Sequence, residues 1–157
     1  MLNPTERVGW SQWSKAAEDG TYVASDMSPD RYTVIVGGLP AGFYVQAILA
    51  GGADITTSGL DLITGTATDM EIILAPNGGT VGGLAPPGSS IWLSRISPHR
   101  AERELFHYHA AADAGGRFAI SGIAPGEYDI SYGAVGRQST PQPIRVSTAQ
   151  RLSLNFP

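Results

Sequence analysis

Apolar and polar residues alternate along several short stretches of the chain, which is the pattern of strands buried on one face. In residues 128–132 the aromatic and aliphatic side chains share one face and the polar ones the other. Residues 70–74 and 152–156 follow a similar alternation, whereas helical periodicity is weak and confined to residues 5–17. The pattern therefore predicts about a dozen strands, arranged as two antiparallel sheets packed face to face.

Two segments of the chain match each other without a gap at an offset of 96 residues. GTYVASDMSPDRYTVIV (20–36) aligns with GRFAISGIAPGEYDISY (116–132), and the stretch 68–76 resembles the last ten residues, 148–157. Self-similarity at a fixed offset is the signature of repeated modules. The sequence therefore predicts a tandem repeat of β-sandwich modules that pack together.

The two copies differ at their beginnings. Nothing before residue 10 matches residues 78–96, which open the second copy. We therefore predict an N-terminally incomplete module over residues 1–76 and a complete one over residues 77–157. An incomplete module leaves a sheet edge open, and open edges pair with other chains, so weak homodimerisation is expected.

A turn containing proline precedes a tyrosine at three places. Proline fixes φ near −65°, which suits a turn. The tyrosine ring can plug the end of a sandwich while its hydroxyl bonds back to the backbone, as in tyrosine corners. Gly126 can adopt positive φ without steric cost, and Asp30 takes its place in the first copy. The predicted turn and plug residues are Pro29, Tyr32, Pro40, Tyr44, Pro125, Gly126 and Tyr128.

The second copy resembles the carboxypeptidase regulatory-like family. The resemblance rests on GTVGGLAPPGSSIWLSRI (79–96) and DAGGRFAISGIAPGEYDI (113–130). These carry the pattern Gly-x-Val-x-Gly, a strand, Asp-x-x-Gly-x-Phe, then Gly-x-x-Pro-Gly-x-Tyr. The resemblance implies an antiparallel sandwich of the immunoglobulin or prealbumin type, within a carbohydrate-binding-like fold. It also implies a non-catalytic attachment to a larger extracytoplasmic protein.

Charge and composition exclude several classes of function. The net charge is −4 and Lys15 is the only lysine, so no basic stripe is available for nucleic acid. The absence of cysteine excludes thiolate metal sites and a cysteine nucleophile. No apolar stretch is long enough to insert into a membrane, and the first residues show no signal-peptide core.

Three histidines are the candidates for a metal site. His107 and His109 are two positions apart on a predicted strand, so their side chains project from the same face. His99 follows Pro98 and could approach across a loop. Three imidazoles could hold zinc or copper. The alternative, which a lone His-x-His pair favours, is the polar outer face of a strand, and no cofactor is then expected.

Three tryptophans are the candidates for ligand binding. Trp92 alternates with Ile91 and Leu93, so it faces outward if those two face the core, and an outward ring can stack on a sugar. The alternative is that it covers a second apolar surface. Trp10 and Trp13 would share a side of a helix but not of a strand.

The function expected from the sequence is a non-catalytic accessory module. It would bind carbohydrate or another protein, or act as a structural spacer in a larger extracytoplasmic protein. The alternative is a small metal-dependent enzyme that uses His99, His107 and His109. Neither a Gly-x-Ser-x-Gly elbow nor a glycine-rich loop leading into a helix occurs.

Overall fold

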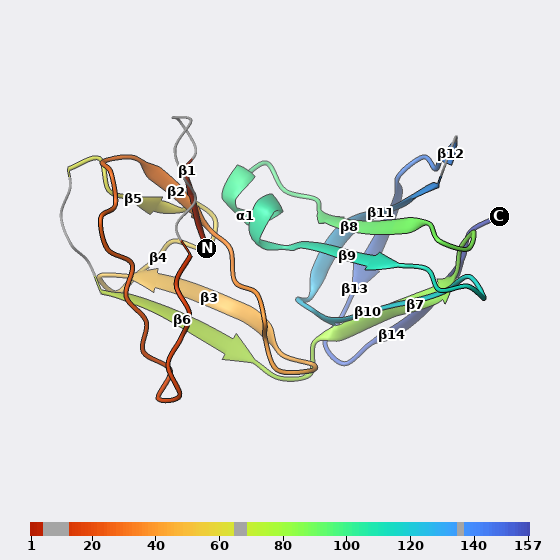
Figure 1. The fold of residues 1–157 in the computed structure, drawn as a ribbon, viewed down its shortest axis with the longest axis horizontal. Helices are drawn as coiled ribbons and strands as arrows, with labels where there is room; N and C mark the ends of the chain where they lie inside the picture. The colour runs from red at the N-terminus through yellow and green to blue at the C-terminus, as the bar shows by residue number, and fades with distance from the viewer. Residues whose placement is uncertain (5–12, 65–68, 135–136) are drawn as a thin grey trace.

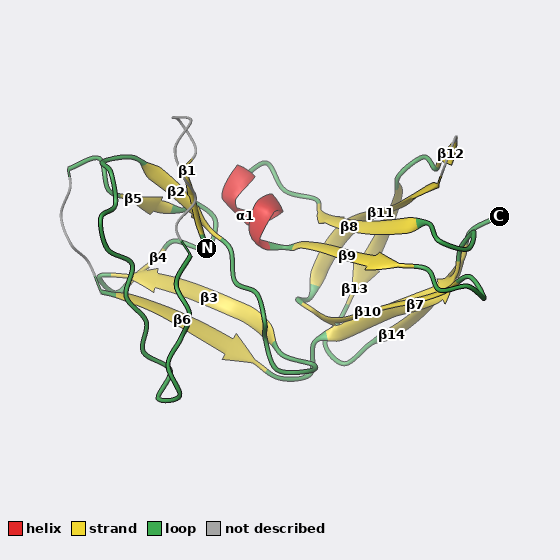
Figure 2. Ribbon diagram, in the orientation of Figure 1, coloured by secondary structure: helices red, strands yellow, loops and turns green. Residues whose placement is uncertain are grey.

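The computed structural model describes residues 1–4, 13–64, 69–134 and 137–157. Within these residues the chain forms four β-sheets and one short helix (Figures 1 and 2). The prediction of an all-β sandwich is confirmed. None of the helices in the described ranges is long and apolar enough to cross a membrane.

Two three-stranded sheets come from the first half of the chain, in the orders β1-β2-β5 and β4-β3-β6. Both are antiparallel. The buried residues Leu2, Val34 and Ile48 belong to their apolar core. The strands are β1 (Leu2–Pro4), β2 (Arg31–Val34), β3 (Tyr44–Ala50), β4 (Ala53–Asp54), β5 (Leu60–Asp61) and β6 (Met70–Ala75).

The other two sheets come from the second half. One has the order β10-β7-β14, with β14 parallel to β7. The other has the order β12-β11-β8-β9, and β13 also pairs with β11. Tyr128, Ile130 and Tyr132 of β11 are buried on one face, as their alternation predicts. The elements are β7 (Gly79–Leu84), β8 (Ser90–Arg95), α1 (Arg100–Leu105), β9 (His107–Ala111), β10 (Arg117–Ile123), β11 (Gly126–Ala134), β12 (Arg137–Gln138), β13 (Gln142–Val146) and β14 (Arg151–Asn155).

Helix α1 lies between the two halves and contacts β2 (Figure 1). It buries Ala101 and Leu105, one helical turn apart. On its exposed side Arg100 Nε donates to Glu104 Oε1 at 2.6 Å. The sequence pattern did not predict this helix, because six residues are too few to establish a 3.6-residue period.

Residues 20–27 do not form the strand that the sequence alignment predicted. The residues aligned with them, 116–123, contain β10, which pairs with β7. Residues 21–30 contain no strand, and Asp26 adopts a φ of 57°. The prediction was wrong here because a strand needs a neighbour: no described strand of the first half pairs with this segment. The weak helical pattern over 5–17 falls largely outside the described residues, and its described part is irregular.

Tyr32 and Tyr128 make the same hydrogen bond, 96 residues apart. The Tyr32 hydroxyl donates to the Ser28 carbonyl at 2.8 Å, and the Tyr128 hydroxyl donates to the Ala124 carbonyl at 2.7 Å. Both rings are buried. Tyr44 opens β3 and is only half-buried, so the third proline turn, at Pro40, does not lead to the same arrangement.

One detail of the turns differs from expectation. Asp30 does not adopt positive φ; instead its carboxylate accepts the Arg31 N–H at 2.7 Å. Gly126, which follows Pro125, has a positive φ of 157°, as expected. A Cβ at this position would also lie 1.7 Å from Arg95 Nη1. Pro29 precedes Asp30 in a bend of the chain.

Candidate binding face

The outer face of β8, β9 and β11 combines one aromatic side chain with several polar ones. Ile91 and Leu93 of β8 are fully buried, so the alternate residue Trp92 points to the other side of the sheet. Across the sheet Trp92 is paired with His109 on β9 and with Ser131 on β11. Register therefore places an imidazole and a hydroxyl on either side of the indole.

The Trp92 ring lies over a glycine of the neighbouring strand. A Cβ at Gly133 would lie 2.7 Å from Cζ3 of the indole, so only glycine leaves room for the ring. On the other side, the rings of Trp92 and His109 are 6.0 Å apart at an angle of 45°. The indole is thus half-buried by its own sheet and keeps a part of its surface exposed.

The polar groups around Trp92 are available to a ligand. Within the described part of the chain, no protein hydrogen bond is made by the His109 ring, the Ser131 hydroxyl or the Asp129 carboxylate. Asp129 pairs with Ser94 one row below Trp92. The face therefore presents one stacking surface with donors and acceptors near it.

Ser94 and His107 form the hydrogen bond of a nucleophile and its base, with 2.9 Å between Ser94 Oγ and His107 Nδ1. In a catalytic triad the histidine stands between the serine and the carboxylate. Here the order across the strands is His107, Ser94, Asp129, so the serine stands in the middle. This arrangement cannot orient the imidazole as a triad does.

The structure does not bring the three histidines together into a metal site. His107 and His109 share the exposed face of β9, whereas His99 precedes helix α1 and is also exposed. Over the ranges that the structure describes, no group of three or more His, Cys, Asp or Glu side chains could hold a metal ion. Zinc or copper binding by the His107–His109 pair stays a prediction.

The other two tryptophans do not belong to this face. Trp13 is 76% exposed and lies in the irregular segment before β2, next to Ser14 of the first half. Trp10 lies outside the described residues. A site shared by the three tryptophans therefore has no support from the part of the chain that is described.

The sequence reasoning missed a cluster around Arg95, at the end of β8 next to α1. Its Nε lies 3.1 Å from Glu102 Oε1, and its Nη1 donates to the Pro125 carbonyl at 2.7 Å and to the Tyr128 hydroxyl at 3.0 Å. The guanidinium also stacks over the rings of Phe106 and Tyr128, 5.0 and 5.2 Å from their centroids. Burial raises the pKa of the Tyr128 hydroxyl. Three of the five guanidinium N–H donors have protein partners, and the cluster ties β8, α1 and β11 together, so it stabilises the fold rather than offering a site.

Comparison with known proteins gives little further information. No family model matches the chain, and no curated protein matches it significantly. Among solved structures, it is similar to a "putative carbohydrate binding protein" from Pseudomonas aeruginosa. The sequence identity is 16%, the match covers 51% of this chain and 89% of the other, and the TM-score is 0.38. The resemblance to the carboxypeptidase regulatory-like family is not confirmed by these comparisons.

Proposed function

We propose that the chain is a non-catalytic binding module that holds a saccharide on the outer face of β8, β9 and β11. The observation that carries the proposal is the position of Trp92 on a polar sheet face, among groups without a protein partner in the described structure. A pyranose ring has an apolar face that stacks on an indole and hydroxyls around its rim that need donors and acceptors. Trp92 supplies the stacking surface, and the polar side chains next to it supply the donors and acceptors.

Each neighbour of Trp92 has a distinct part in the proposed site. His109 and Ser131 each combine a donor and an acceptor, and they flank the indole from opposite sides. Asp129 supplies carboxylate oxygens, which accept hydrogen bonds from sugar hydroxyls. Because the face belongs to a sheet rather than a cleft, we expect weak binding of an extended oligosaccharide rather than tight capture of a single sugar.

The experiment is thermal melting of untagged protein against a panel of soluble cello-, xylo-, chito- and malto-oligosaccharides. A ligand that binds only the folded state stabilises it by about 2.7 kcal/mol at a hundredfold excess over Kd. We expect at least one oligosaccharide to raise the Tm. Trp92→Ala should abolish that shift, and the matched control Trp13→Ala should leave it unchanged.

Three other results would count against the proposal. A shift that survives Trp92→Ala would place the ligand elsewhere. Flat curves across the panel would favour a structural spacer. A shift with Zn²⁺ or Cu²⁺ alone, lost in His107→Ala, would favour the metal-dependent alternative.

A further inference from the structure

A carboxylate and two imidazoles lie on opposite sides of Trp92, on the outer face of β8, β9 and β11. Trp92 is paired with Ser131 of β11, and Asp129 lies two residues before Ser131 on the same face of the sheet. Asp129 is therefore a diagonal neighbour of Trp92, about 7–8 Å away. His107 and His109 belong to β9, on the other side of β8.

The neighbours of Asp129 across the sheet leave its carboxylate free. On β8 it is opposite Ser94, whose hydroxyl is bonded to Nδ1 of His107 at 2.9 Å instead. On β13 it is opposite Pro143, which has an apolar side chain. Within the described ranges no hydrogen bond or ion pair involves the Asp129 carboxylate. This half-buried acceptor can therefore take a donor from a ligand.

The next charged pair along the sheet contains one charge of each sign. Glu127 of β11 is opposite Arg145 of β13, and both are exposed. Asp129 has no basic residue opposite it on either neighbouring strand. A cationic group placed between Asp129 and Trp92 would meet a carboxylate on one side and the face of an indole, which also attracts cations, on the other.

We propose that the saccharide bound at Trp92 is an amino sugar whose free amine is protonated, as in oligomers of glucosamine. The inference rests on the proposed function and specifies the class of ligand for the same face. The sugar ring stacks on the indole, and its ammonium donates to the Asp129 carboxylate. An ammonium has three donors and no acceptor, so the Ser94 hydroxyl oxygen can accept a second bond. Hydrogen bonds between two charged groups are roughly twice as strong as neutral ones.

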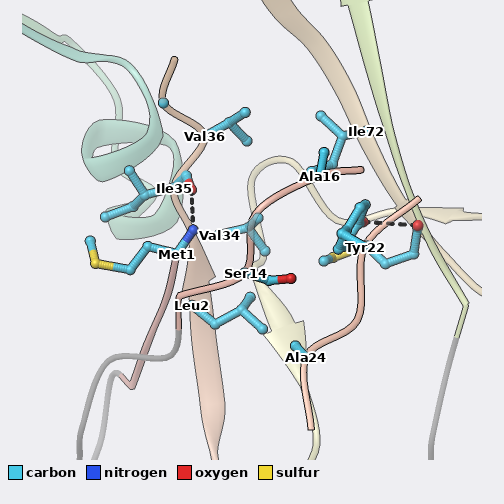
Figure 3. Close-up of a pocket in the computed structure, with 12 residues that line it drawn as sticks. Met1, Leu2, Ser14, Ala16, Tyr22, Ala24, Val34, Ile35, Val36 and Ile72 are labelled. Carbon is cyan, nitrogen blue, oxygen red and sulfur yellow. Dashed lines mark hydrogen bonds between the residues drawn. The ribbon is translucent and has the colours of Figure 1, made fainter. Parts of the chain in front are cut away.

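The pocket of the first half does not offer this chemistry (Figure 3). It has a volume of about 140 Å³ and lies between β2 and β6, where residues 13–24 cover it. Among the described residues that line it, none carries a carboxylate. The Tyr22 hydroxyl donates to the Met70 carbonyl at 2.9 Å, and the Met1 ammonium donates to the Ile35 carbonyl at 2.7 Å. A cationic sugar therefore finds no anionic partner there.

The test compares three tetrasaccharides that share β-1,4-linked pyranose rings and differ at carbon 2. Cellotetraose carries a hydroxyl there, the N-acetylglucosamine tetramer an acetamide, and the glucosamine tetramer an ammonium. Each is titrated into the full chain labelled with ¹⁵N at about pH 6, where such an amine carries its proton. The signal is the indole N–H of Trp92, identified by its absence in Trp92→Phe. We expect the glucosamine tetramer to bind about tenfold more tightly than the other two.

Two variants with the same change of charge locate the ammonium. Asp129→Asn keeps the shape of the side chain and should reduce the preference for the glucosamine tetramer to below about twofold. The matched control Glu127→Gln, on the same face of the same strand, should keep the full preference. A general attraction between an acidic chain and a polycation would weaken equally in both variants.

The possible outcomes separate this inference from the proposed function. Equal affinities for the three tetrasaccharides at Trp92 would overturn the amino-sugar inference and leave the saccharide site standing, whereas no shift with any sugar would overturn both. A preference that survives Asp129→Asn would also overturn the inference, because the ammonium would then lie elsewhere. Shifts centred on Val34 and Ile72 would place the ligand in the pocket of the first half, with the same consequence.

Discussion

Replacing the two equivalent tyrosines by phenylalanine should have unequal effects on stability. Tyr32 and Tyr128 align with each other at the offset of 96 residues, and each donates a hydrogen bond to the carbonyl four residues earlier. Phenylalanine keeps the ring and removes only the hydroxyl. The pair therefore compares one hydrogen bond in two environments of the same chain.

The structure sets the magnitude of each effect. The Tyr128 hydroxyl bonds to the Ala124 carbonyl and to Arg95 Nη1, and Ala124 is only 3% exposed. An unsatisfied buried carbonyl costs about 1–3 kcal/mol, and the bond to a charged group adds to this, so Tyr128→Phe should lower the free energy of unfolding by about 3 kcal/mol. The Ser28 carbonyl belongs to an exposed residue, and water can replace the Tyr32 hydroxyl. Tyr32→Phe should therefore cost only about 1 kcal/mol.

Urea denaturation followed by far-ultraviolet circular dichroism measures both values. Because the halves could unfold separately, tryptophan fluorescence should be followed in parallel with Trp10 and Trp13 replaced by phenylalanine, so that Trp92 reports on the second half. The reasoning is refuted if the two variants differ by less than about 0.5 kcal/mol, or if Tyr32→Phe is the more destabilised. Either result would mean that leaving the Ala124 carbonyl and the Arg95 guanidinium without the Tyr128 hydroxyl costs little free energy of unfolding.

Three further predictions concern pH and close packing. Burial raises the pKa of Tyr128, so above about pH 10 the unfolded chain loses a proton that the folded chain keeps. The free energy of unfolding therefore falls as the pH rises. In alkaline urea titrations the wild type should lose up to about 1.4 kcal/mol per pH unit more than Tyr128→Phe. Gly83→Ala would place a Cβ 1.6 Å from the Leu154 carbonyl oxygen, which should separate β7 from β14 and lower stability by about 3 kcal/mol or more in thermal melting. Gly133→Ala should instead push the Trp92 ring toward water, with a red-shifted emission and a stability loss below about 1.5 kcal/mol.

The alternation of side chains predicted the strands of the second half because their two faces differ in polarity. Tyr128, Ile130 and Tyr132 are buried, as the pattern requires. The same alternation pointed to the cluster that the sequence analysis missed, because it places Arg95 on the inward face of the strand, after Ile91 and Leu93. A charged residue at an inward position needs a partner, but nothing in the sequence identifies Glu102 and the Tyr128 hydroxyl as those partners.

Periodicity also predicts that Trp92 and His109 face outward, but it does not show that they are neighbours. Their proximity depends on the pairing of β8 with β9 and on its register. The same pairing joins Ser94 to His107 and leaves His99 at the start of α1. Shifting the register by one residue would move every one of these side chains to the other face, so contacts across a sheet follow from pairing rather than from the sequence of one strand.

Two segments that align in sequence show how strongly a strand depends on its neighbour. GTYVASDM (20–27) contains threonine, tyrosine and valine, which favour strands at least as much as GRFAISGI (116–123) does. Only the second segment forms a strand, and it does so beside β7. The first segment instead lines a pocket of the first half, and its Tyr22 hydroxyl donates to the Met70 carbonyl of β6. Because strand-forming residues occur in both segments, the difference comes from tertiary pairing rather than from local preference.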